Sequence, residues 1–170
     1  YILEEQIKQD NYDLVCFTIP FPGNLFSALR CAQFIKRTYP SLKVAFGGGY
    51  CNTELRRLSD PRIFDFVDFI TLDDGEGPLL KITEFLDHKI ERTYICKNNE
   101  VVYADKQPNT IFHHKNLPAP SYIGLPTAKY LSFLDVMNPM HRMWSDGKWN
   151  KLTISHGCYW KQCSFCDVTL

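Results

Sequence analysis

The stretch that decides the fold is LVCFTIPFPGNLFSALRCAQFIK, residues 14–36. It opens with an apolar run without polar alternation, which is typical of a strand buried on both faces of a parallel sheet. After the PFPG turn the apolar residues change to helical spacing, with Asn24 as the candidate N-cap. The stretch therefore predicts one strand–helix unit of an α/β domain.

The alternation of strand and helix continues on both sides of this unit. The order α-β-α-β-α-β-α predicts a Rossmann-like (flavodoxin-like) parallel sheet with right-handed crossovers. A sheet of this type normally has a strand before its first helix, so we expect the natural chain to start upstream and this first strand to be missing. The alternative is that another strand completes the sheet. The outer elements are expected as helices at 1–9, 53–60 (starting at Thr53) and 78–88, and as strands at 42–50 and 64–72.

The pattern changes after residue 90. RTYICKNNEVVY, residues 92–103, predicts a β-hairpin around an Asn98-Asn99 turn. Prolines then punctuate residues 105–150, which indicates an extended connector. WNKLTISHG predicts a further strand that leads into a cysteine cluster. We therefore expect three parts: a Rossmann-like domain at 1–88, a connector with the hairpin at 89–148, and the start of another domain at 149–170.

Composition excludes several classes of protein. The formal net charge is zero, so nothing indicates a nucleic-acid or acidic-membrane partner. No apolar run reaches the roughly 18 residues of a spanning helix. The cysteine count is seven, with one tight cluster, which argues against a secreted disulfide framework and favours a cytoplasmic, reducing compartment. Four scattered cysteines are expected to be buried small hydrophobes: Cys16, Cys31, Cys51 and Cys96.

The cysteine cluster has metal-ligand spacing. Cys158, Cys163 and Cys166 form Cys-x4-Cys-x2-Cys on one loop, and thiolates are soft ligands for zinc or iron–sulfur centres. A structural zinc site needs four ligands, and His156 could supply the fourth. A [4Fe–4S] cluster held by three cysteines leaves one iron open, which is useful only if another molecule binds it.

The segment GCYWKQCSFCD, residues 157–167, resembles the cluster loop of radical S-adenosylmethionine (SAM) proteins that carry an N-terminal cobalamin (B12)-binding domain. The family's commonest spacing is Cys-x3-Cys-x2-Cys with an aromatic before the last cysteine; here Phe165 is that aromatic, and the first gap has one extra residue. The resemblance implies that the three cysteines hold a [4Fe–4S] cluster and that the amino and carboxylate groups of SAM bind its fourth iron. Phe165 would shield the cluster or border the adenine, although core packing is an alternative.

The resemblance extends along most of the chain, over residues 21–36, 43–56, 67–80 and 138–152. It implies that the loop of Gly47, Gly48 and Gly49 receives the nucleotide tail of cobalamin, where glycines let backbone N–H groups approach an anion. A tight turn is the alternative explanation. Thr18 lies at the same expected edge of the sheet. No Asp-x-His-x-x-Gly motif and no histidine before His88 offers the axial ligand of many cobalamin domains.

A third loop, LDDGEGP at residues 72–78, belongs to the same expected edge. Its acidic residues either face a ligand or another domain, or are solvated acids at a helix start. They are Asp73, Asp74 and Glu76.

The function expected from the resemblance is radical SAM chemistry. In the whole enzyme the reduced cluster would cleave SAM to a 5′-deoxyadenosyl radical that abstracts hydrogen from a small-molecule or peptide substrate, and cobalamin could carry a methyl group. The electron would come from a donor such as a flavodoxin or ferredoxin. The SAM contacts would lie beyond Leu170, so we expect no catalytic residue here and no activity of these residues alone. Two alternatives remain: a radical SAM enzyme that does not use cobalamin, and a non-enzymatic Rossmann-like module with structural zinc.

Overall fold

The computed structural model describes residues 2–84, 90–105, 116–119, 121–126, 129, 159–160 and 162. The chain forms two compact units, Tyr1–Phe112 and His113–Leu170. The first unit is an α/β domain with a five-stranded mixed sheet in the order β1-β2-β3-β4-β5. This architecture is compatible with the Rossmann-like fold that the sequence predicts.

Three neighbouring strands of the sheet are parallel: β1 (Leu14–Thr18), β2 (Lys43–Gly47) and β3 (Phe69–Thr71). The register places Cys16 beside Ala45 and Ala45 beside Phe69. Strand β3 is shorter than predicted because the preceding residues form a 3-10 helix, η2 (Pro61–Asp65), which Asp60 caps by accepting from the Arg62 N–H. The three strands of the predicted parallel sheet are therefore present, and the third is short.

The predicted hairpin is confirmed. Strands β4 (Thr93–Lys97) and β5 (Glu100–Ala104) pair antiparallel, and the φ angles of Asn98 and Asn99 are 52° and 62°. Positive φ at both central residues is the backbone that a two-residue hairpin turn requires. The sequence analysis places this hairpin in a connector, whereas the structure pairs β4 antiparallel with β3 and so extends the sheet beyond residue 88.

The helices differ from the prediction at their starts. Helix α1 spans Ile2–Gln9, and α2 spans Pro22–Thr38. The expectation that Asn24 caps α2 is wrong: the N-cap is Phe21, because Pro22 has the φ of a first helical residue and starts the helix earlier. Helix α3 (Gly49–Thr53) also begins earlier than predicted and continues as the 3-10 helix η1 (Glu54–Arg57), and α4 spans Glu76–Thr83.

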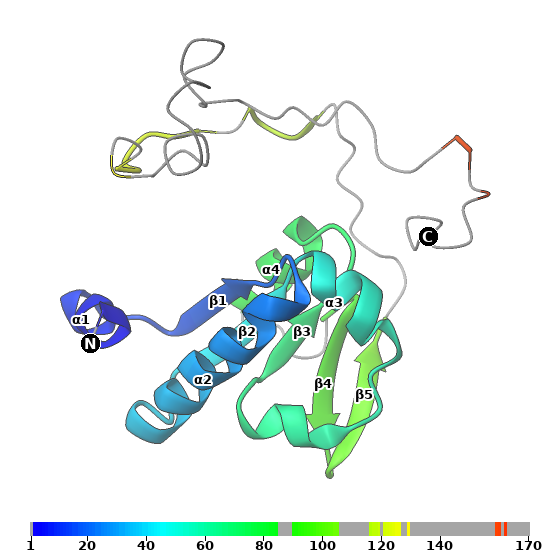
Figure 1. Ribbon diagram of the computed structural model, residues 1–170, viewed down its shortest axis with the longest axis horizontal. Helices are drawn as coiled ribbons and strands as arrows, with labels where there is room; N and C mark the ends of the chain where they lie inside the picture. The colour runs from blue at the N-terminus through cyan, green and yellow to red at the C-terminus, as the bar shows by residue number, and fades with distance from the viewer. Residues whose placement is uncertain are drawn as a thin grey trace. The chain divides into compact units, whose positions relative to one another are not determined.

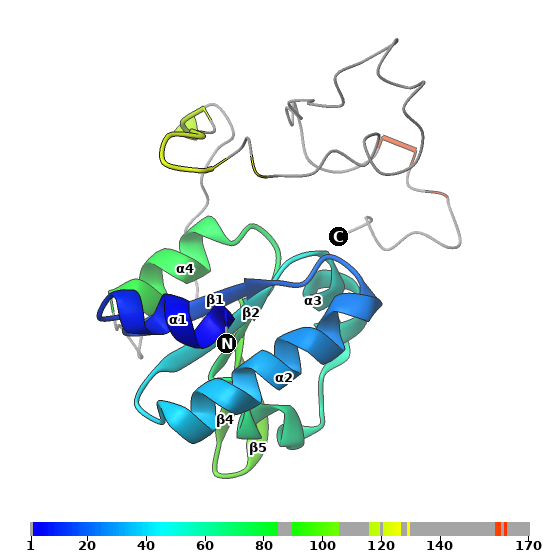
Figure 2. The same ribbon diagram turned by 60° about the vertical axis from the view of Figure 1, so that its left-hand side comes forward.

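The hydrophobic core lies between the sheet and α2, which runs across the parallel strands (Figures 1 and 2). Alternate strand residues face this helix, and the buried helix residues oppose them, as the period-2 and period-3.6 patterns require. Helices α3 and α4 begin beside the carboxyl ends of the parallel strands (Figure 1). The core residues of the strands and α2 are Val44, Phe46, Ile70, Tyr94, Ala28, Ala32 and Ile35.

The expectation of buried cysteines holds only for Cys51, which is fully buried. Cys31 is half-buried, and Cys16 and Cys96 are exposed. Cys16 alternates with the core residues Val15 and Phe17 along β1 and therefore faces away from the core. None of the described helices combines the length and apolar content that crossing a membrane requires.

Candidate functional site

A cavity of about 390 Å³ lies at the carboxyl ends of β1, β2 and β3, next to the start of α4. Ligands of open α/β sheets bind at this edge, and a few hundred Å³ is the size of a small-molecule pocket. We name it the carboxyl-edge cavity. Its lining residues are Cys16, Phe17, Thr18, Ala45, Phe46, Gly47, Gly48, Thr71, Asp73, Gly75, Glu76 and Leu79.

The glycine loop is shaped by close backbone approach. A Cβ at Gly48 would lie 2.9 Å from both the backbone N and O of Ile19, and the φ of Gly48 is +100°. A Cβ at Gly47 would lie 2.8 Å from the Thr71 hydroxyl oxygen. Contacts with the Ile19 backbone and the positive φ therefore require glycine at position 48, whether or not a ligand binds, whereas a Cβ at position 47 would displace the Thr71 side chain.

The loops after β1 and β2 are joined by backbone hydrogen bonds. The Ile19 N–H donates to the Gly47 carbonyl at 2.7 Å, and the Tyr50 N–H donates to the Ile19 carbonyl at 3.0 Å. The Asn52 N–H donates to the Gly48 carbonyl at 3.2 Å. These partners mean that the Tyr50 and Asn52 N–H groups at the start of α3 are already used, although an anion site would need such donors.

The loop after β3 is held by residues that the sequence analysis did not select. Asp73 has a φ of 60°, its N–H donates to Asn52 Oδ1 at 2.7 Å, and its carboxylate forms an ion pair with Arg56. Arg56 Nε also donates to the Asn52 carbonyl at 2.9 Å, and the Tyr94 hydroxyl donates to the Arg56 carbonyl. Asn52 and Arg56 thus fix Asp73 at the cavity. In the sequence, the only signal for this arrangement is Asp73 itself, which directly follows the predicted strand and belongs to a residue type that tolerates positive φ.

The polar groups of the cavity are mainly acceptors. The Thr71 hydroxyl donates its proton to the Phe46 carbonyl at 3.2 Å, so its oxygen remains available as an acceptor. Glu76 is exposed in the first turn of α4, where its charge suits the positive helix end. Asp74 is not among the lining residues.

Two thiols lie near the carboxyl edge of the sheet, those of Cys16 and Cys51, and neither is suited to act as a nucleophile. Partial desolvation of the otherwise exposed Cys16, which lines the cavity, raises its pKa, and full burial raises the pKa of Cys51 in α3 to about 12. Both thiols are therefore protonated at neutral pH, whereas a nucleophilic cysteine needs a lowered pKa.

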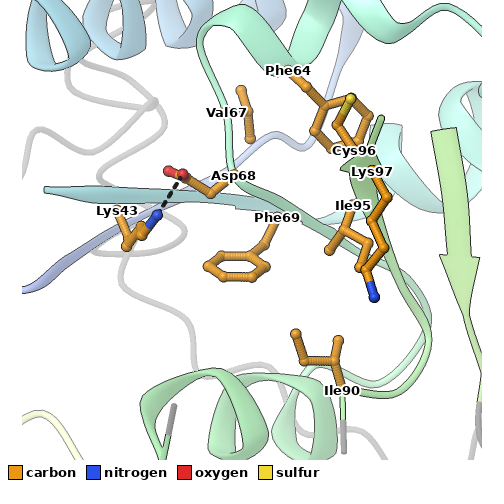
Figure 3. A pocket seen from close by; sticks show the side chains of 9 residues that line it. All are labelled: Lys43, Phe64, Val67, Asp68, Phe69, Ile90, Ile95, Cys96 and Lys97. Atoms are coloured by element: carbon orange, nitrogen blue, oxygen red, sulfur yellow. Dashed lines mark hydrogen bonds and ion pairs between the residues drawn. The ribbon is translucent and has the colours of Figure 1, made fainter. Parts of the chain in front are cut away.

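A second cavity of equal size, about 390 Å³, lies near the start of β3 and the end of β4 (Figure 3). We name it the amino-side cavity; it is lined by Lys43, Phe64, Val67, Asp68, Phe69, Ile90, Ile95, Cys96 and Lys97. Its carboxylate, Asp68, accepts from Lys43 Nζ at 3.2 Å, from the Val44 N–H at 2.8 Å and from Lys36 Nζ. Asp68 therefore accepts from three protein donors and holds the edge of the sheet.

The predicted site residues separate into two groups. Thr18, Gly47 and Gly48 line the carboxyl-edge cavity, and Gly49 lies beside it, where a Cβ would be 3.2 Å from the Pro20 carbonyl oxygen. The others lie outside the described residues: Cys158, Cys163, Cys166, Phe165 and His156. The described residues contain no group of three or more His, Cys, Asp or Glu side chains that could hold a metal ion.

Comparison with protein-family models gave no match to this chain, and comparison with curated proteins gave none either. The structure itself establishes an α/β unit with a five-stranded mixed sheet and a cavity at the carboxyl ends of its parallel strands.

Proposed function

We propose that this chain contributes two parts of a radical SAM enzyme: a cofactor-binding α/β unit and the loop that holds the iron–sulfur cluster. The observation that carries the proposal is the spacing of Cys158, Cys163 and Cys166, with the aromatic Phe165 before the last cysteine. Three thiolates on one short loop suit an iron–sulfur cluster with one open iron, whereas a structural zinc site needs a fourth ligand.

The residues of the loop have defined tasks in this proposal. The three thiolates would hold the cluster, and one iron would remain for the amino and carboxylate groups of SAM. The cluster, when bound and reduced, would supply the electron that cleaves SAM. Phe165 would shield the cluster from water.

The carboxyl-edge cavity supports a cofactor role for the α/β unit, and we propose that this cofactor is cobalamin. A volume of about 390 Å³ suits the nucleotide tail and is too small for the whole cofactor, so the corrin ring belongs outside the cavity. Thr18, Gly47 and Gly48 would contact the tail. No histidine lines the cavity, so its described walls offer no axial imidazole.

The wider assignment follows from this chemistry. The whole enzyme would transfer a methyl group or perform another radical reaction on a small molecule or peptide. It would receive single electrons from a flavodoxin or ferredoxin type of donor. An oxygen-sensitive cluster and unpaired thiols are compatible with the cytoplasm.

The cluster is tested by anaerobic reconstitution of the whole protein with iron and sulfide. We expect about four irons and four sulfides per chain, and an EPR spectrum of the reduced cluster that changes when SAM is added. Serine at any of the three positions should abolish the signal: Cys158→Ser, Cys163→Ser or Cys166→Ser. Cys96→Ser is the matched control, because Cys96 is exposed in the α/β unit, and it should leave the signal unchanged.

Two results would contradict the proposal in different ways. Protein that binds zinc without acid-labile sulfide would overturn the radical SAM assignment and favour structural zinc, with His156 as the fourth ligand. Protein with a SAM-responsive cluster that does not retain hydroxocobalamin on gel filtration would remove only the cobalamin part.

A further inference from the structure

The amino-side cavity lies on the face of the sheet that α2 does not cover. Ile70 and Tyr94 pair across β3 and β4, and both belong to the core beneath α2. Phe69 precedes Ile70 and Ile95 follows Tyr94, so both point to the opposite face, where they line the cavity. This space is therefore separate from the core, and it shares no described lining residue with the carboxyl-edge cavity.

Most of the described wall of this cavity is apolar. Phe64, Phe69 and Ile95 are half-buried, and Val67 is fully buried. Ile90 is 3% exposed, although it is not a member of the core cluster. A ligand with an apolar body would remove the half-buried side chains from water, and a volume of about 390 Å³ lies in the range of small-molecule pockets.

The charged groups of the described wall are one carboxylate and two ammonium groups. The carboxylate of Asp68 accepts from Lys43 and from the Val44 N–H. It also accepts from Lys36, which is mostly buried and is not among the lining residues. Because two lysines already offset the charge of Asp68, this acid does not repel a negatively charged ligand strongly.

Lys97 is the remaining cation of the wall. Its ammonium group forms no hydrogen bond or ion pair with any residue that the structure describes. Figure 3 shows the side chain of Lys97 running beside Ile95, with the nitrogen directed toward Ile90. The stem of this exposed lysine therefore extends the apolar wall, and its charge lies at the border of the cavity.

We propose that the amino-side cavity binds a small amphipathic monocarboxylate, whose apolar body contacts Phe69 and Ile95 and whose carboxylate pairs with Lys97. Charge complementarity selects this class of ligand: an apolar cation would meet the like charges of Lys43 and Lys97, and an uncharged ligand would leave Lys97 without a partner. Asp68 keeps its structural role. The proposal is independent of the function proposed above, because neither the cysteine loop nor the carboxyl-edge cavity takes part in it.

Octanoate and 1-octanol test the proposal on the 170-residue chain, because both carry the same length of apolar chain and only octanoate is charged. Titrations followed by methyl ¹H–¹³C NMR should shift the signals of Val67, Ile90 and Ile95. We expect octanoate to bind about three- to fivefold more tightly than 1-octanol at low salt, with a smaller ratio at high salt. Octanoate should also slow the iodoacetamide labelling of Cys96, an exposed thiol that lines the cavity.

Variants of Lys97 separate its charge from its apolar stem. Lys97→Met keeps an unbranched stem and should weaken octanoate binding about three- to fivefold, while 1-octanol binding stays within about twofold. Lys97→Arg keeps the charge and should retain the preference for octanoate. Lys81→Met is the matched control, because Lys81 lies in α4 and is not among the lining residues, and it should keep the wild-type ratio.

Three results would overturn this inference. If neither probe shifts the signals of Val67, Ile90 and Ile95, the cavity binds no such ligand. If 1-octanol binds as tightly as octanoate, the carboxylate is not recognised. If Lys97→Met keeps the wild-type ratio, Lys97 is not its partner. Urea denaturation checks that the variants are folded, as we expect for an exposed residue at the end of β4.

Discussion

The two cavities of the α/β unit have the same volume, about 390 Å³, but use their acidic residues in opposite ways. At the amino-side cavity, Asp68 is mostly buried and accepts from two lysines and a backbone N–H. At the carboxyl-edge cavity, Asp73 has one side-chain ion pair and Glu76 is exposed, and no cation is among the described residues that line the space.

The difference shows that cavity size alone does not identify a functional site. A carboxylate whose oxygens are saturated by protein donors stabilises the fold and has little left for a ligand. A carboxylate with free acceptor capacity at the carboxyl end of a parallel sheet can bind one. We therefore propose that the acid of the amino-side cavity stabilises the fold and that the carboxyl-edge cavity binds a ligand. The following experiments test these two roles.

Thiol chemistry should show the largest contrast. Burial raises the pKa of Cys51, behind the carboxyl edge, from 9.0 to about 12, whereas Cys96 is exposed at the amino-side cavity. At pH 8 the thiolate fraction of Cys51 is about a thousandfold below that of a thiol at the ordinary value. Iodoacetamide labelling followed by mass spectrometry should modify Cys96 at least about a hundredfold faster than Cys51.

The same shift sets a pH dependence of stability. Because the folded-state pKa of Cys51 is raised, its contribution is fully present below pH 9 and is lost as the pH rises from 9 toward 12. Labelling of Cys51 should therefore accelerate in that window as the chain unfolds. Labelling of Cys51 at the rate of Cys96 in folded protein at pH 8 would contradict its burial.

Gly48→Ala should destabilise the carboxyl edge strongly. The new Cβ would lie 2.9 Å from the Ile19 backbone at a φ of +100°, so the free energy of unfolding should fall by about 2–3 kcal/mol. Gly23→Ala is the control: nothing lies within 4 Å of its Cβ position near the start of α2, and its stability should stay unchanged or rise slightly. Urea denaturation measures both, and equal midpoints would refute the close approach of the two loops.

Asp68→Ala should cost about 1–3 kcal/mol of unfolding free energy, because it leaves the Val44 N–H without its partner and removes the ion pairs of Lys36 and Lys43. Such a loss would show that Asp68, the acid of the amino-side cavity, stabilises the folded protein. A loss below about 0.5 kcal/mol in urea denaturation would remove this distinction between the cavities.

Asp73→Asn should show the smallest effect on stability, below about 1 kcal/mol, because its ion pair with Arg56 is partly exposed and asparagine tolerates positive φ. The hydrogen bond from its backbone N–H to Asn52 is kept. A loss as large as that of Asp68→Ala would indicate that Asp73 is structural too and would weaken the assignment of binding to the carboxyl edge.

Local sequence signals predicted several elements well. The unbroken apolar run of residues 14–19 became β1, and the Asn98-Asn99 pair formed the expected hairpin turn. They failed at helix starts, where Pro22 and Gly48 decided the position instead of Asn24 and Thr53. In the candidate site, Thr18, Gly47 and Gly48 were predicted because they lie at strand ends. Asn52 and Arg56 were not predicted, because each acts through a contact with Asp73, which lies 21 and 17 residues further along the chain.

The sequence by itself determined the alternation of strands and helices, the hairpin, and the spacing of Cys158, Cys163 and Cys166, because each depends on neighbouring residues and their local preferences. Only the tertiary structure decided that the hairpin pairs with β3, that Asp68 accepts from three donors, and that Asp73 and Glu76 line a cavity with no cation among its described lining residues. These features depend on long-range contacts: a carboxylate's environment is set by the groups that folding brings beside it, and the order of residues along the chain does not record them.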